Sequence, residues 1–261
     1  MGDTPILVDP VSEAERILAG AHADGVVVRV TGGVAVALHA PAMPDALKRP
    51  YQDIDLVCRF ADAGKAAALL TKLDYEANER FNKMNAATRM VFYDNEHGKQ
   101  IDVFVGEFVM CHRIPIAGRL DVDDRTVPLA ELLLTKLQVV RLNPKDLKDI
   151  WAIMVDHDTA DHDSDAINVD FVAHLLARDW GLWRTSQGTI ELARSRLPSS
   201  GLEPSQQATI DARLGRLWSR VEEEPKTLRW RTRARLGEHA QWFQEPEEIA
   251  HAETLTHEET S

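Results

Sequence analysis

The feature that most constrains this chain is a pair of acidic side chains inside an apolar run. Asp53 and Asp55 stand two positions apart in the segment DIDLVC (53–58), whose other residues are all apolar. Side chains alternate between the faces of a β-strand, so both carboxylates share one face while Ile54 and Leu56 point into the core. A carboxylate buried without a partner costs several kcal/mol, so a cation is expected between the two. Mg²⁺ or Mn²⁺ suits such a site, because Mg²⁺ binds one or two carboxylates and completes its shell with water and phosphate oxygens.

A third aspartate repeats this arrangement further along the chain. Asp102 stands between Ile101 and Val103 in the segment QIDVFV (100–105), which has the composition of another strand. A third carboxylate can complete a two-metal site or accept the proton of an attacking hydroxyl group. We therefore predict Asp53, Asp55 and Asp102 as metal ligands and catalytic residues.

Two adjacent glycines supply a candidate phosphate site. Thr31-Gly32-Gly33 separates the β-branched run VVVRV (26–30) from the helix-like run VAVALHA (34–40). A strand, a glycine pair and a helix start present bare backbone N–H groups, which the helix dipole makes attractive to phosphate oxygens. Thr31, Gly32 and Gly33 are thus predicted to bind nucleotide.

Local signals place further elements around these motifs. Ser12 and Glu15 form a capping-box pattern and Gly25 can end the helix that they begin, while 41–50 is a proline-containing loop. The patterns predict a helix over 61–73, strands over 89–94 and 100–105 joined by a turn at 95–98, and a hairpin over 114–124. Later in the chain they predict helices over 129–142 and 145–155, an acidic His-rich loop over 157–165, and helices from 167 to 243 with breaks near 198–204 and at Pro225.

These elements predict an α+β (α/β) fold. A small mixed sheet with flanking helices would occupy 1–125, and a helical domain would occupy 126–245. The stretch 246–261 is polar and acidic and is expected to be a disordered tail.

In this order the motifs resemble the nucleotidyltransferase superfamily, which includes DNA polymerase beta, antibiotic nucleotidyltransferases and small toxin-like transferases. Gly32-Gly33 stands where the family more often has Gly-Ser, Asp53-Ile54-Asp55 matches its metal motif, and Asp102 matches its third carboxylate. The long interval between Gly33 and Asp53 is similar to that of the abortive-infection (AbiEii-type) toxins. The resemblance implies a polymerase-beta-like fold, NTP as substrate and Mg²⁺ as cofactor.

A weaker resemblance extends further along the chain. Lys136 in LAELLLTKLQVVRL, and Asp146 and Asp149 in PKDLKDIWAI, resemble the lysine and the R-D-x-x-D-L element of AbiEii-type proteins, with Lys145 where arginine is more usual. The resemblance implies that Lys136 contacts the triphosphate and that one of the two aspartates matters for activity. Arg49 precedes the metal motif, as an arginine does in antibiotic-modifying members, and it either touches phosphate or is an exposed loop residue.

The function predicted from these residues is transfer of an NMP from an NTP, such as ATP, with release of pyrophosphate. The resemblance favours an RNA or tRNA end, or a protein side chain, as the acceptor of a toxin-like enzyme. An antibiotic of the aminoglycoside or lincosamide type is a second possible acceptor. A non-catalytic nucleotide-binding module, or a partner of an antitoxin protein, is the alternative from another class.

Composition limits the setting in which this chemistry takes place. The 261 residues carry a net charge of −12, which makes the chain a poor general binder of polyanions. The two cysteines, Cys58 and Cys111, show no disulfide or zinc pattern, and neither a signal peptide nor an apolar run of membrane-spanning length is visible. A cytoplasmic protein without membrane contact is therefore expected.

One stretch departs from this acidic character. Trp230 lies within a basic segment formed by Lys226, Arg229, Arg231, Arg233 and Arg235. Such a segment either contacts phosphate groups while the indole stacks on a base, or forms a helix face whose charge the preceding glutamates 222–224 balance. The expectation for the tryptophans Trp180, Trp183, Trp218, Trp230 and Trp242 is packing within the helical domain and not stacking on a ligand.

Overall fold

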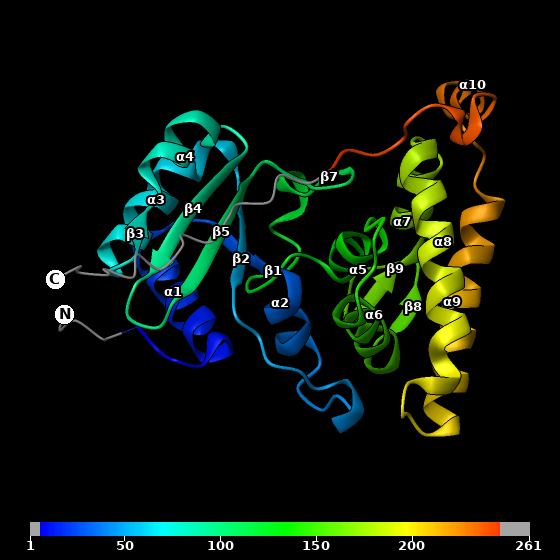
Figure 1. Cartoon of the computed structure of the whole chain (residues 1–261), viewed down its shortest axis with the longest axis horizontal. Coiled ribbons are helices and arrows are strands. Elements are labelled where there is room, and N and C mark those ends of the chain that lie inside the picture. Colours follow the sequence, from blue (N-terminus) through cyan, green and yellow to red (C-terminus); the bar gives the residue numbers. More distant parts are fainter. Residues whose placement is uncertain (1–5, 246–261) are drawn as a thin grey trace, which may run out of the picture.

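The computed structural model describes residues 6–245 of the chain. In Figure 1 a β-sheet with helices α1, α3 and α4 (Glu79–Asn85) lies on one side and helices α5–α10 lie on the other, with α2 (Gly32–His39) between them. Helix α2 contacts β1 and β2 as well as α5 and α6, so it joins the two groups of elements. The predicted α+β class is confirmed. The predicted tail, 246–261, lies outside the described residues.

The sheet has five strands in the order β1-β2-β5-β4-β3. Only β2 and β5 run parallel; the other neighbouring pairs are antiparallel. The strands are β1 Val28–Thr31, β2 Ile54–Cys58, β3 Glu76–Ala77, β4 Arg89–Asp94 and β5 Lys99–Val105. The predicted strands and the predicted turn between β4 and β5 are confirmed, with bounds that shift by at most two residues.

Alternation along the strands gives the sheet one apolar face. Ile54 and Leu56 of β2 lie beside Ile101 and Val103 of β5, and all four are about 1% exposed or less. Helices α1 (Pro10–Asp24) and α3 (Ala63–Lys72) pack against each other and share this hydrophobic core. The opposite face carries the odd-numbered residues of β2, which are Asp55 and the buried Val57, so its polar part lies at the Asp55 end of the strand.

The N-cap of helix α1 lies three residues before the predicted cap, Ser12. The Asp9 carboxylate accepts a hydrogen bond from the Ser12 backbone N–H at 2.9 Å, so Asp9 and not Ser12 is the N-cap. Pro10 at the first helical position explains this start, because its fixed φ angle suits the first turn and its missing N–H has no partner to lose there. Gly25 ends the helix with a φ of 64°, as predicted.

The middle of the chain differs from the prediction at three places. The hairpin lies at β6 (Glu107–Val109) and β7 (Arg113–Pro115) and not over 114–124. Helix α5 ends at Leu137, because a new helix with its own N-cap at Asn143 begins so soon afterwards. The predicted loop over 157–165 contains β8 (Asp158–Ala160), which pairs in parallel with β9 (Ala166–Asn168).

The C-terminal part is built from helices around a continuation of the same core. Proline or a capping side chain marks the start of each helix, as at Pro144 of α6 and Asn168 before α7. The helices are α5 Leu129–Leu137, α6 Pro144–Asp156, α7 Val169–Leu176, α8 Trp180–Arg196, α9 Pro204–Glu223 and α10 Leu228–Ala234. Among the residues described, no helix combines the length and the apolar character that crossing a membrane requires.

Candidate functional site

Three site residues form a row across the polar face of the sheet. Thr31 of β1 is the register partner of Asp55 in β2, and Asp55 is the register partner of Asp102 in β5. Residues directly opposite each other on neighbouring strands point to the same face. Asp55 and Asp102 therefore lie side by side on this face, as the sequence predicts.

Gly32 stands against the Asp55 carboxylate at the start of helix α2 (Gly32–His39). Its φ angle is 67°, in the left-handed region that other residues rarely adopt, and a Cβ atom here would overlap Asp55 Oδ2. Glycine is thus required both by the backbone turn and by the space that the carboxylate occupies. The close approach puts the positive end of helix α2 next to Asp55.

Asp102 is held by two neighbours that were not predicted from the sequence. Arg89 Nε and Nη2 lie 2.8 and 2.7 Å from Asp102 Oδ1, and Gln100 Nε2 donates to Oδ2 at 2.7 Å. Asp53, just before β2, accepts a hydrogen bond from the Gln100 backbone N–H at 3.3 Å. Asp53 and Asp102 are therefore both tied to Gln100.

Asp55 differs from its neighbours because its carboxylate has no hydrogen bond or salt bridge within residues 6–245. Burial, together with the charge of Asp102, raises the pKa of Asp55 to about 7, and Lys136 only partly opposes this rise. A half-buried acid that lacks a partner and has an adjacent acid is a candidate ligand for a cation.

The three predicted ligands do not form a ready-made metal cage. Within the described part of the chain, no group of three or more His, Cys, Asp or Glu side chains is arranged to hold a metal ion together. The Asp55–Asp102 pair still fits Mg²⁺, which needs only one or two carboxylates when water and phosphate supply its other ligands. Asp53 would join them only if its side chain turned from the Gln100 amide.

A second charged group lies beside this row and joins helices α5 and α6 to the loop before β2. Lys136 Nζ of α5 is 2.8 Å from Asp149 Oδ2 of α6, and Arg49 Nε and Nη2 donate to the two oxygens of Asp149 at 2.9 and 2.8 Å. Burial acts to raise the pKa of Asp149, but Lys136 and Arg49 outweigh it and lower that pKa. Asp149 therefore fixes two cations in one place.

These contacts distinguish residues that the sequence left equivalent. Asp146 Oδ1 lies 3.8 Å from Lys136 Nζ, and Oδ2 accepts a hydrogen bond from the Asn143 backbone N–H at the start of α6. Burial raises the pKa of Asp146. Asp149 is the aspartate that joins Lys136 to Arg49. Arg49 is not an exposed loop residue, since only 13% of its side chain is exposed.

Glycine also shapes this second group. A Cβ atom at Gly33 would meet the Arg49 guanidinium, so the absence of a side chain lets Arg49 lie against the first turn of α2. Thr31, by contrast, is fully buried, and its hydroxyl has no hydrogen-bond partner among the described residues. Thr31 can therefore reach a bound nucleotide only if the end of β1 moves.

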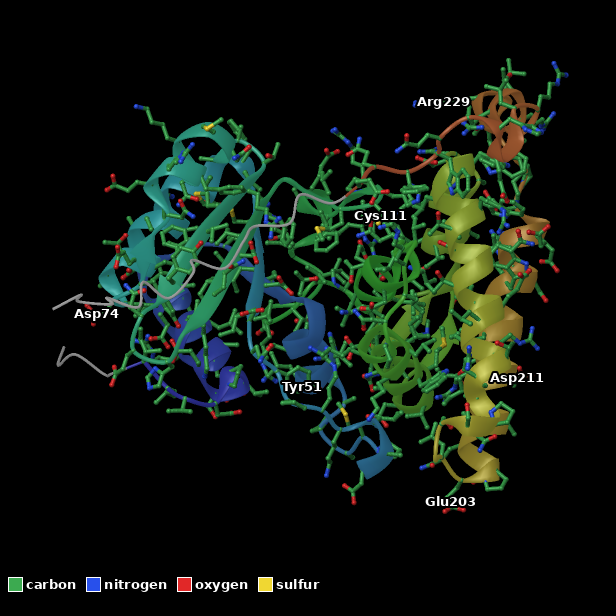
Figure 2. The ribbon with its side chains drawn as sticks, viewed as in Figure 1. Tyr51, Asp74, Cys111, Glu203, Asp211 and Arg229 are labelled. Carbon is green, nitrogen blue, oxygen red and sulfur yellow. The ribbon has the colours of Figure 1, made fainter. Side chains whose placement is uncertain are left out.

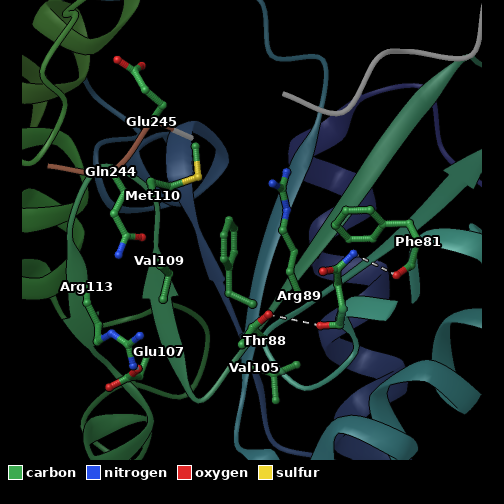
Figure 3. Close-up of a pocket in the computed structure, with 12 residues that line it drawn as sticks. Phe81, Thr88, Arg89, Val105, Glu107, Val109, Met110, Arg113, Gln244 and Glu245 are labelled. Atoms are coloured by element: carbon green, nitrogen blue, oxygen red, sulfur yellow. Dashed lines mark hydrogen bonds and ion pairs between the residues drawn. The ribbon is translucent and has the colours of Figure 1, made fainter. Parts of the chain in front are cut away.

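A cavity of about 250 Å³ continues the polar face beyond Asp102 (Figure 3). Arg89 and Phe81 form one wall and Met110 and Gln244 the opposite one, with Arg113 lower on that second side. Arg89 connects the cavity to the carboxylate row, because the same guanidinium binds Asp102. Sequence reasoning missed Arg89, although an arginine at the start of an otherwise apolar strand is a signal for a partner acid.

Comparisons with known proteins add no family to this geometry. Neither a protein-family model nor a curated protein sequence matches the chain. The function is therefore inferred from the residues of the site.

Proposed function

We propose that this protein is a Mg²⁺-dependent nucleotidyltransferase that moves an NMP from an NTP to an acceptor hydroxyl group. The observation that carries the proposal is the Asp55 carboxylate, which lies beside Asp102 and against the glycine turn and has no hydrogen bond or salt bridge within residues 6–245. A structural acid would be expected to have a bonded partner at such a position. This one faces a position where a cation and a phosphate oxygen would both be stabilised.

The charges around the row suit a triphosphate. Asp55 and Asp102 would hold Mg²⁺, with Asp53 as a further ligand, and the ion would neutralise phosphate oxygens and favour the leaving pyrophosphate. The first turn of α2 at Gly32 and Gly33 offers backbone N–H groups to the same phosphates. Lys136 and Arg49, both fixed by Asp149, supply positive charge for the far end of the triphosphate.

The reaction would be an in-line displacement at the α-phosphorus. The acceptor oxygen forms a bond to the α-phosphorus while the bond to the bridging oxygen of the pyrophosphate breaks. The acceptor proton passes to a carboxylate of the row or to water. Positioning and electrostatic stabilisation would account for most of the rate, as in other phosphoryl transfers.

The test is incubation of the protein with α-labelled NTPs, Mg²⁺ and a panel of tRNA, protein and cationic antibiotic acceptors. Label transfer with pyrophosphate release is expected for one acceptor class and should disappear in Asp55→Asn. Exposed Asp74→Asn, outside the site, serves as the control. Tight NTP binding without pyrophosphate would instead favour a nucleotide-binding module, and transfer that survives Asp55→Asn would contradict the proposed role of the row.

A further inference from the structure

A second pocket, with a volume of about 460 Å³, lies between α10, the start of α8 and the β6–β7 hairpin. Arg229 on α10 and Cys111 in the turn between β6 and β7 belong to its walls and are labelled in Figure 2. Its lining combines arginine with tryptophan: Arg178, Arg229 and Arg233 with Trp180, Trp230 and Trp242. It therefore contains part of the basic segment for which the sequence left two interpretations.

The charge of this pocket is opposite to that of the chain. Asp179 is the one acidic residue in its lining. Its carboxylate caps helix α8 by accepting a hydrogen bond from the Leu182 backbone N–H at 3.0 Å. Arg178 and Arg229 are exposed, and neither forms a salt bridge with any residue in the range 6–245. Two arginines without a salt bridge in this range that line one pocket, in a chain of net charge −12, are therefore available to an external anion.

The neighbouring arginines of the helical part are not available in this way. Arg184, Arg194 and Arg220 each lie 2.5 to 2.7 Å from a carboxylate oxygen. The balance by glutamates 222–224 that the sequence allowed therefore does not extend to Arg229: Glu224 pairs with Arg220 and His174. Exposed arginines without a salt bridge in the described chain, such as Arg196, also occur elsewhere on the helical part, and what distinguishes this pocket is that Arg178 and Arg229 share its lining with three tryptophans.

The aromatic walls are fixed before any ligand binds. Arg233 donates to the Gly237 and Ala240 carbonyls at 2.8 and 2.7 Å, and its guanidinium carbon lies 4.6 Å from the Trp180 ring centroid. The Trp230 ring packs edge-on against Trp183 at 5.2 Å, and its buried Nε1 has no hydrogen-bond partner among the described residues. The pocket thus has ring surfaces that are held in place, and its lining also includes two arginines without a salt bridge to any described residue.

We propose that this pocket binds a nucleotide unit, with its base against the tryptophan rings and its phosphate at Arg178 and Arg229. Aromatic rings stack on any base, and arginine recognises phosphate through its planar set of donors. The unit can belong to a free nucleotide or to a single-stranded nucleic acid. The position of the neighbouring cavity at Arg89 favours a single-stranded nucleic acid.

The two cavities share part of their lining. Arg113 and Gln244 border both this pocket and the cavity at Arg89, and Arg89 binds Asp102 of the carboxylate row. A strand held at Arg178 and Arg229 can therefore continue past Arg113 towards Asp102. The inference that the end of this nucleic-acid strand is the acceptor rests on the proposed function. The inference of the binding site does not.

Fluorescence anisotropy with a labelled 12-nucleotide single-stranded RNA, without metal or NTP, tests the site. Arg178→Gln/Arg229→Gln is expected to weaken binding about 10-fold or more and to reduce the slope of log K against log salt by about 1.4, the value for two lost contacts to a single strand. The matched control is Arg80→Gln/Arg196→Gln, which removes the same charge from two exposed arginines without salt bridges in the described chain. It should change affinity about 2-fold or less.

A second titration with AMP separates the two sources of the nucleotide unit. A strand that binds much more tightly than AMP, with both lost in the pocket variant, identifies nucleic acid as the ligand. Equal affinities for strand and AMP, again lost in that variant, identify a free nucleotide. Equal losses in the pocket and control variants, or no binding of either probe to the wild type, would overturn the proposal. Asp55→Asn should keep strand binding, so a failure of transfer chemistry is distinguishable.

Discussion

Replacing Asp55 with asparagine is expected to stabilise the protein in the absence of metal, and only above a defined pH. The folded state raises the pKa of Asp55 from 3.8 to about 7, because the carboxylate is buried beside Asp102. The folded protein therefore holds this proton more tightly than the unfolded chain does. The stabilising contribution of the protonated acid is complete below pH 3.8 and is lost as pH rises through the folded value near 7.

The magnitude comes from the same two values. A shift from 3.8 to about 7 at 1.36 kcal/mol per pKa unit gives a free energy of about 4 kcal/mol. Asparagine is nearly the same size and carries no charge, so it avoids this penalty while keeping the shape of the site. Above pH 8 the variant should be more stable than wild type by about 2–4 kcal/mol, which in a chain of this size corresponds to a melting temperature higher by about 10 °C.

The assay is thermal unfolding of both proteins from pH 5 to pH 8.5 in EDTA, and then the same series in Mg²⁺. The difference in melting temperature should increase between pH 5 and 7.5 and then level off. Mg²⁺ should raise the melting temperature of the wild type at pH 8 and leave that of the variant unchanged. A variant that is less stable at pH 8, or a difference that is constant with pH, would refute the assignment of Asp55 as an uncompensated acid.

Three further substitutions test the surrounding geometry. Asp149→Asn should destabilise the protein by about 1–3 kcal/mol at pH 7, measured by urea unfolding, because Lys136 and Arg49 lose their shared partner. Since these cations lower the pKa of Asp149, the difference in stability between wild type and variant should disappear as pH falls below 4. Gly32→Ala should cost about 2–3 kcal/mol from the left-handed backbone and the overlap with Asp55, whereas Gly25→Ala, with a φ of 64° and open space, should cost about 1 kcal/mol. Lys136→Met should raise the KM for NTP more than 10-fold, measured by pyrophosphate release, and should cost no more stability than Asp149→Asn, because Asp149 keeps its two hydrogen bonds from Arg49. An unchanged KM would remove Lys136 from the triphosphate site.

Local rules were enough to predict the carboxylate face. Alternation along β2 puts Asp55 on the face opposite Ile54 and Leu56, and these flanking apolar residues fix which side is buried. The helix after the glycine pair was predicted from Val34, and it begins two residues earlier, at Gly32. The start of α1 was wrong because two capping side chains compete within four residues, and Pro10 decides in favour of Asp9.

Contacts between distant segments could not be predicted in this way. The side-by-side position of Asp55 and Asp102 depends on the register of two strands that are far apart in sequence, and Arg89 reaches Asp102 only through the pairing of β4 with β5. The link from Lys136 through Asp149 to Arg49 depends on how α5 meets α6. Sequence reasoning named these three residues through a resemblance, but only the packing shows which aspartate joins them.

The two short strand pairs, β6–β7 and β8–β9, were missed for a different reason. The segments 107–109 and 113–115 are too short to show a clear alternation, and the acidic composition of 157–165 is typical of a loop. Both pairings depend on the elements around them. The hairpin matters for function, because Arg113 on β7 borders both cavities.

The most direct measurement is a crystal structure with Mn²⁺ and a non-hydrolysable NTP, in which anomalous scattering locates the metal. We predict a peak about 2.1 Å from carboxylate oxygens of Asp55 and Asp102, with the triphosphate against Gly32 and its far end towards Lys136. Asp102 would then have exchanged its contact with Arg89 for the metal. An NTP bound away from this row, or a metal that leaves Asp55 uncoordinated, would contradict the account.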